Sequence, residues 1–239
     1  LVLGAGKSAA VMAAAVEAAW PDVDLSGLVV TRYGHGHPTA RIEVAEAAHP
    51  VPDEAGARAA RRMLDLAAAA GAGDLVLFLV SGGGSSLTTL PAPGLTLDDL
   101  MAVNRALLAS SATINEMNCI RRHLSAFSGG RLALAAAPAR VVTLAISDVP
   151  GDDPASIASG PTVPMGLDRA EARKAVELYR LELPPAAAEL LASDLNPPPA
   201  PGDARFALNS VRIVASASLS REAAAAMATR VGLVAVDTA

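Results

Sequence analysis

The stretch VLFLVSGGGSSLTTL (residues 76–90) carries an apolar run straight into a segment with almost no side chains. Ser81 is followed by Gly82, Gly83 and Gly84, and then by Ser85 and Ser86. Consecutive backbone N–H groups with so little steric cover can converge on an anion, and the serine hydroxyls can add hydrogen bonds. A plain strand-to-helix turn is the alternative. Because three adjacent glycines carry a large entropic cost, the pattern favours an anion-binding loop.

Outward from this stretch, short apolar segments alternate with alanine-rich amphipathic segments. This alternation predicts an α/β fold with a mostly parallel sheet covered by helices on both faces. The expected strands cover 1–4, 27–31, 42–48, 74–80, 140–146, 207–216 and 233–239. The expected helices cover 7–19, 53–70, 97–109 (with a Thr96–Asp99 capping box), 114–123, a segment from Gly129 and Gly130, 168–181, 185–193 and a segment capped near Ser218 or Ser220. The proline-rich residues 196–202 are expected to form a stiff loop before the last strand–helix–strand unit.

The overall composition restricts the class of partner and the compartment. The 239 residues carry a formal net charge of -5, which argues against nucleic acid as the main partner. Cys119 is the single cysteine, so no internal disulfide can form and we expect a cytoplasmic location. No apolar segment reaches the ~20 residues that span a bilayer, so no membrane partner is expected. Because the chain starts inside an expected strand without Met and ends within another, we expect it to be truncated at both ends, as part of a longer protein.

The first strand leads into Gly4, Ala5, Gly6, Lys7 and Ser8. With Ala9 these residues match the dinucleotide fingerprint G-x-G-x-x-A, which would indicate an oxidoreductase. The second strand, however, is followed by Arg32 where an NAD enzyme has an acid; an NADP enzyme could use an arginine there. A P-loop fails, because the required first glycine is Leu1. Lys7 at the start of a helix opposes the helix dipole, which favours an anionic ligand over a solvated lysine.

Further charged residues follow the next expected elements. Asp148 comes directly after a buried strand, with Asp152 close behind, an arrangement suited to magnesium; a polar turn with a helix-capping Asp is the alternative. Arg121, Arg122 and His123 are contiguous, and helical neighbours point ~100° apart, so they cannot all face one ligand. The loop histidines have no convincing metal-ligand spacing: His35, His37 and His49.

Several of these segments together resemble the bacterial glycerate 2-kinases, a class that also bears the name hydroxypyruvate reductase. The resemblance covers nearly the whole chain. It rests on the GAGK start, HPVPD (49–53), SGGGSS (81–86), PAPG (91–94), INEMNCIRRHLSAFSGGRL (114–132) and SDVPGDDPASIASGPT (147–162).

The resemblance implies a kinase that transfers the γ-phosphoryl group of ATP to the 2-hydroxyl of D-glycerate, with Mg2+ or another divalent cation. It implies that residues 1–239 form a Rossmann-like N-terminal lobe and that the family's smaller C-terminal lobe, with a second catalytic cationic residue, is absent from this chain. It assigns catalysis to Lys7 and Asp148. It assigns substrate or phosphate binding to the glycine loop (residues 82–84) with Ser85. It also assigns substrate binding to Arg121 and His123.

Two points stay open at this stage. Asp148 is expected either to hold the metal, together with Asp152, or to accept the hydroxyl proton. The alternatives to a kinase are an NAD(P)H-dependent hydroxypyruvate reductase and a non-catalytic sugar-acid-binding module that uses the same loop. The expected partners are the small molecules D-glycerate and ATP, and a homodimer is left open.

Overall fold

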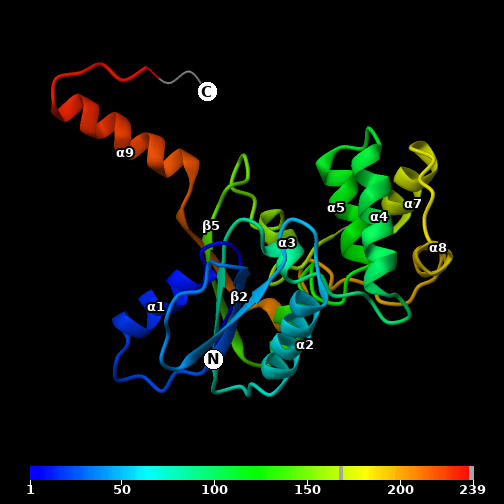
Figure 1. Cartoon of the computed structure of the whole chain (residues 1–239), viewed down its shortest axis with the longest axis horizontal. Helices are drawn as coiled ribbons and strands as arrows, with labels where there is room; N and C mark the ends of the chain where they lie inside the picture. The colour runs from blue at the N-terminus through cyan, green and yellow to red at the C-terminus, as the bar shows by residue number, and fades with distance from the viewer. Residues whose placement is uncertain (167–168, 237–239) are drawn as a thin grey trace.

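A computed structural model, which describes residues 1–166 and 169–236, contains a six-stranded sheet with helices around it (Figure 1). The strand order is β3-β2-β1-β4-β5-β6, and every neighbouring pair is parallel. The strands are β1 (Val2–Ala5), β2 (Gly27–Arg32), β3 (Ile42–Ala47), β4 (Leu75–Val80), β5 (Arg140–Ile146) and β6 (Ser210–Ala215). This confirms the predicted Rossmann-like α/β fold.

The strand order places a topological switch point between β1 and β4. The chain runs outward from β1 through β2 to β3, and then returns to build β4, β5 and β6 on the other side. In register, Ala5 lies opposite Val30 and Val80, and Val80 lies opposite Ala145. The loops that leave these strands therefore start at one edge of the sheet, where open parallel sheets bind their ligands.

Helices cover both faces of the sheet, as predicted. On one face α1 (Ala9–Ala19) packs against Leu77 and Leu79 of β4. On the other face α2 (Glu54–Ala68) and α6 (Arg131–Ala136) pack with Phe78 and Val80. The alternation along β4 explains why the strand is apolar throughout, since both of its faces are buried.

The remaining longer helices, apart from α9, form a second apolar cluster beside the sheet (Figure 1). They are α4 (Leu97–Ala109), α5 (Ile114–His123), α7 (Arg169–Leu178) and α8 (Pro185–Ala192). Their core includes Val103, Leu107, Ile120 and Leu124, none more than 1% exposed. In the sequence, α4 and α5 follow β4, and α7 and α8 follow β5. In space, the cluster faces the edge of the sheet.

Most predicted boundaries agree with the structure within a few residues. The capping box at Thr96 and Asp99 is present, and residues 196–202 form neither helix nor strand. The helix expected over 168–181 is observed from Arg169 to Leu178; residue 168 lies outside the described residues. None of the helices in residues 1–166 and 169–236 is both long enough and apolar enough to cross a membrane.

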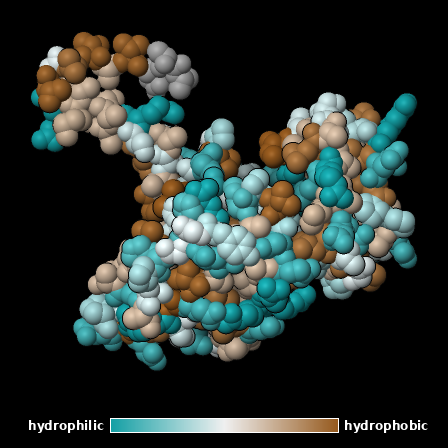
Figure 2. Space-filling model, in the orientation of Figure 1, coloured by the Kyte–Doolittle hydropathy of each residue, from teal (hydrophilic) through white to brown (hydrophobic). Residues whose placement is uncertain are grey.

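The C-terminal segment differs from the prediction. Helix α9 (Ala217–Arg230) is capped by Ser216, two residues before the nearer of the expected caps, because the hydroxyl of Ser216 accepts the N–H of Leu219. The helix extends away from the sheet, and apolar residues gather on this arm (Figures 1 and 2). No strand forms over residues 233–236, where Val234 is 90% exposed, so the predicted last strand is wrong there; residues 237–239 lie outside the described part. An apolar sequence alone does not make a strand when no neighbouring strand is in reach.

Candidate active site

Each glycine of the glycine loop, which follows β4, lies in close contact with a different residue. A Cβ at Gly82 would meet the carboxylate of Asp148. A Cβ at Gly83, which has a left-handed φ of 88°, would lie 2.7 Å from Nε2 of His49. A Cβ at Gly84 would lie 2.6 Å from the Cβ of Ala158. The missing side chains therefore let a carboxylate and an imidazole approach the backbone of the loop.

The loop after β1 is locked to the loop after β4. The buried hydroxyl of Ser81 accepts the N–H of Ser8 at 3.0 Å, and the carbonyl of Gly82 accepts the N–H of Lys7 at 3.0 Å. A Cβ at Gly6 would lie 2.5 Å from the carbonyl oxygen of Ser81. Internal packing thus accounts for this glycine of the G-x-G pattern. Ser81 joins the two loops, and its side chain is used in that contact.

Lys7 and His49 lie on the same side of the glycine loop. Lys7 is exposed, and its Cε is 3.4 Å from the position that a Cβ would take at Gly83. Burial lowers the pKa of His49, and the positive charges of Lys7 and Arg32 lower it further, while Asp148 acts in the opposite sense. This environment favours the neutral form of the imidazole. Sequence reasoning missed His49 as a site residue, because it tested the histidines only for metal-ligand spacing.

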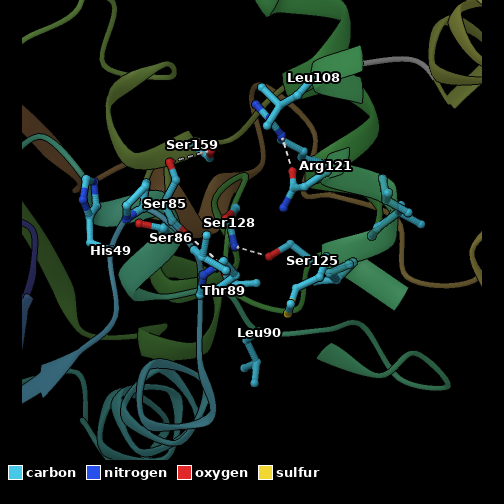
Figure 3. A pocket seen from close by; sticks show the side chains of 18 of the residues that line it. His49, Ser85, Ser86, Thr89, Leu90, Leu108, Arg121, Ser125, Ser128 and Ser159 are labelled. Atoms are coloured by element: carbon cyan, nitrogen blue, oxygen red, sulfur yellow. Dashed lines mark hydrogen bonds between the residues drawn. The ribbon is translucent and has the colours of Figure 1, made fainter. Parts of the chain in front are cut away.

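A cavity of about 450 Å³ lies between the glycine loop and the helical cluster (Figure 3). Its polar side contains the hydroxyls of Ser85, Ser86, Ser125, Ser128 and Ser159. Ser85 and Ser159 share a hydrogen bond of 3.0 Å. Its apolar side comes mainly from α4, through Leu100, Met101, Val103 and Leu108. The cavity can therefore hold a ligand that has both a polar and an apolar part.

Arg121 supplies a positive charge to this cavity. Its Nε donates to Oδ1 of Asn104 at 2.8 Å and its Nη1 donates to Oδ1 of Asn118 at 3.3 Å. Both partners are neutral, and burial lowers the pKa of Arg121. The ion pairs found within residues 1–166 and 169–236 join Arg62 to Glu43 and Arg205 to Asp203. Because no carboxylate pairs with Arg121 in that part of the chain, its charge is available to an anionic ligand.

The two residues after Arg121 lie elsewhere. Arg122 is buried and donates to the carbonyl of Ala155 at 2.5 Å, and burial lowers its pKa to about 10. His123 is also buried, with Nδ1 2.9 Å from the carbonyl oxygen of Cys119, and it lines a separate cavity of about 310 Å³. The structure therefore does not bring His123 to the glycine loop. Of the three contiguous residues, only Arg121 lines the larger cavity.

The two predicted metal ligands, Asp148 and Asp152, contact different parts of the chain. Asp148 is exposed and lies against Gly82. Asp152 accepts the hydroxyl of Ser218 in α9 at 2.9 Å, and the hydroxyls of Ser147 and Ser218 lower its pKa. Within residues 1–166 and 169–236, no three His, Cys, Asp or Glu side chains group as metal ligands. A site with one or two carboxylates fits magnesium, which takes its other ligands from water and substrate phosphates.

Comparison with known proteins adds a family and its relatives. A family model described as a domain of unknown function (DUF4147) matches residues 1–192. A protein of Agrobacterium vitis with the provisional name hydroxypyruvate reductase is 54% identical over 237 residues, which cover 98% of this chain and 60% of the relative. The D-glycerate 2-kinase of Thermotoga maritima is 44% identical over 183 residues, covering 76% of this chain and 44% of the relative.

The solved structures agree with these relatives. The crystal structure of a glycerate kinase from Thermotoga maritima matches with a TM-score of 0.88 and 36% identity, covering 97% of this chain and 55% of the other. The chain therefore spans about half the length of the curated relatives that it matches.

Proposed function

The chain belongs to the DUF4147 family, and we propose that it forms the Rossmann-like lobe of a glycerate 2-kinase. The reaction is the transfer of the γ-phosphoryl group from ATP to the 2-hydroxyl of D-glycerate. A bond forms between the hydroxyl oxygen and the γ-phosphorus, the bond from that phosphorus to the β,γ-bridging oxygen breaks, and ADP leaves. The expectations of a cytoplasmic location and of a homodimer remain predictions.

One observation supports this function most directly: two cationic side chains, Lys7 and Arg121, flank a loop of backbone amides and form no ion pair within residues 1–166 and 169–236. Phosphoryl transfer to a hydroxy acid brings two anions together, a carboxylate and a phosphate chain. Its catalysis consists mainly of positioning these anions and neutralising their charge. The site provides positive charge from Lys7 beside Gly83 and from Arg121 in the cavity for that task.

Each residue then has a role. Arg121 binds the carboxylate of D-glycerate, since a guanidinium matches a carboxylate in a two-bond geometry. The amides of Gly82 and Gly83, with the hydroxyl of Ser85, hold the substrate beside the loop, while the amide of Gly84 donates to the carbonyl of Ser81. Lys7 neutralises charge on the transferred group. His123 is left out of these roles, because it lies in the other cavity.

Asp148 has two candidate roles, both at the point where it lies against Gly82. It can hold the divalent cation, which would supply charge neutralisation on the phosphate oxygens; Asp152 contacts Ser218 instead. It can instead accept the proton that the substrate hydroxyl loses. In Asp148→Asn, loss of the metal dependence would assign the first role, and an altered pH–rate profile with unchanged metal dependence would assign the second.

The experiment that tests the function gives the full-length protein two substrate pairs in parallel. D-glycerate with ATP–Mg should produce ADP, and hydroxypyruvate with NADH should leave the nicotinamide absorbance unchanged. NADH oxidation without ADP would contradict the kinase and establish the reductase. Binding of D-glycerate without turnover in either assay would establish the non-catalytic module.

A further inference from the structure

Three basic side chains leave the carboxyl ends of three adjacent strands. Lys7 follows β1, Arg32 is the last residue of β2, and His49 comes two residues after β3. The strands are in parallel register here, with Ala5 opposite Val30 and Arg32 opposite Ala47. Their side chains therefore start from one edge of the sheet, at the side of the glycine loop away from Arg121.

Among the described arginines, both Arg122 and Arg32 have a buried Nε without a hydrogen-bond partner; the guanidinium of Arg122 donates through Nη2 to the carbonyl of Ala155, whereas Arg32 lies at the carboxyl end of β2. Arg32 itself is half-buried. Other arginines near the same strands are satisfied: Arg41 donates to backbone carbonyls, and Arg62 pairs with Glu43. A buried donor without a partner is costly, which indicates that a ligand supplies the acceptor.

His49 brings the three groups together. Its Nε2 is the nearest atom to the position of a Cβ at Gly83, and Cε of Lys7 lies beside the same position. The positive charges of Lys7 and Arg32 both act on the imidazole of His49, so all three groups are neighbours in space. The acidic group that acts on His49 is Asp148, which lies against Gly82, where the proposed function places the divalent cation.

We infer that Arg32 and His49 join Lys7 to bind the phosphate chain of the nucleotide, with Arg32 donating Nε–H to a phosphate oxygen. This inference rests on the proposed function and extends it to two residues. Two cationic side chains and an imidazole donor match a chain of phosphates better than one carboxylate. The carboxylate of the substrate has its own cation in Arg121, on the opposite side of the cavity from His49 (Figure 3).

The same phosphate chemistry could come from a second source. An arginine at the end of the second strand can also hold the 2′-phosphate of NADP in a dinucleotide-binding fold. The structure favours the nucleoside triphosphate, because Ser81 occupies the space beside Gly6 that the pyrophosphate of a dinucleotide would need. The experiment below therefore includes NADPH as a separate ligand.

The test is calorimetric titration of the full-length protein with ATP–Mg, inorganic tripolyphosphate, NADPH and D-glycerate. Arg32→Gln and His49→Gln are compared with Arg61→Gln, which changes an exposed arginine on α2. Loss of a charge-assisted hydrogen bond should weaken ATP and tripolyphosphate binding by roughly 10- to 100-fold in Arg32→Gln. D-glycerate affinity should change by less than about two-fold, and Arg61→Gln should match the wild type.

The outcomes separate this inference from the function on which it rests. Unchanged ATP affinity in both variants, in a protein that still phosphorylates D-glycerate, overturns the inference and leaves the kinase standing. NADPH binding that depends on Arg32 overturns it in favour of the dinucleotide. If tripolyphosphate binding depends on Arg32 but the protein shows no kinase turnover, the anion site is supported and the proposed kinase function is contradicted. His49→Gln leaves β2 unchanged, so it tests the site even where Arg32→Gln does not fold.

Discussion

Lys7 is one of only two lysines in the chain, and it is the one that reaches the glycine loop. Its ammonium is placed to neutralise a transferred phosphoryl group, a contribution that matters most in the transition state. Lys7→Met should therefore lower kcat by about 10²–10⁴-fold while circular dichroism and the urea unfolding midpoint stay unchanged.

The matched control is Lys174→Met, which changes the other lysine, exposed on α7. It should retain wild-type kcat. Full activity in Lys7→Met would remove Lys7 from the mechanism.

Gly83 offers a second test at the residue scale, because Gly94 has the same φ of 88° with open space around it. Alanine at either position adopts a left-handed backbone, which should destabilise the fold by about 1–2 kcal/mol. Only at Gly83 does the added methyl group meet His49. Gly83→Ala should thus lose both stability and kcat/KM, and Gly94→Ala should lose stability alone, as measured by urea unfolding and steady-state kinetics. An equal loss of activity in both variants would refute a specific role for the contact with His49.

The sequence showed the anion-binding pattern of the glycine loop but not its surroundings. Three adjacent glycines after an apolar strand predict a backbone cradle from local chemistry alone. The approach of His49, Asp148 and Ala158 depends on which strands are neighbours, and that information is absent from the spacing of motifs. Arg32 was considered only as a dinucleotide feature for the same reason.

At the scale of one element, α5 shows how a helix sorts contiguous residues. Its buried side carries Cys119, Ile120 and His123, and the next side carries Arg121 into the larger cavity. The prediction that Arg121, Arg122 and His123 cannot share one ligand follows from the helical period and is confirmed. Which of them faces the site could not be predicted, because the packing partners of α5 come from α4 and α7.

The start of α5 gives a prediction about pH. The hydroxyl of Thr113 donates to Oε2 of Glu116 at 2.7 Å, and the hydroxyl of Tyr179 donates to the same oxygen at 3.0 Å. These bonds, that of Thr113 first, lower the pKa of Glu116 below its ordinary value of 4.5. A lowered folded-state pKa stabilises the fold above about pH 4.5, and this contribution is lost as pH falls through the folded-state pKa.

Urea midpoints measured between pH 7 and pH 3 should therefore fall more steeply for the wild type than for Glu116→Gln. The variant should be less stable at pH 7, and the two curves should converge at low pH. Parallel curves over the whole range would show that the carboxylate contributes nothing to the folded state.

The end of the chain shows the limit of reading elements from sequence. The predictions of the six strands in the sheet are correct because each of these apolar segments has a parallel neighbouring strand. Residues 233–236 have the same apolar character, but they follow α9, which extends away from the sheet (Figure 1). Strand formation needs a partner for the backbone hydrogen bonds, and the sequence of one segment does not supply that partner.

At the scale of the whole molecule, the site lies where two packed bodies meet. The sheet contributes the loops after β1, β2, β3, β4 and β5, and the helical cluster contributes Arg121 and the apolar wall of α4. The alternation of strands and helices predicted the parallel sheet, but the strand order and the switch point between β1 and β4 came from the structure. The second body was not predicted, because its helices read as ordinary coverings of a sheet until their own core is seen.

We propose that this arrangement serves phosphoryl transfer to a hydroxy acid. The most direct measurement is 31P NMR of the full-length protein incubated with D-glycerate and ATP–Mg. We expect ADP and 2-phosphoglycerate to appear in equal amounts, with the new phosphorus signal coupled to the proton on C2. No phosphorylated glycerate, together with oxidation of NADH when hydroxypyruvate is added, would contradict it and make the loop after β1 a dinucleotide site.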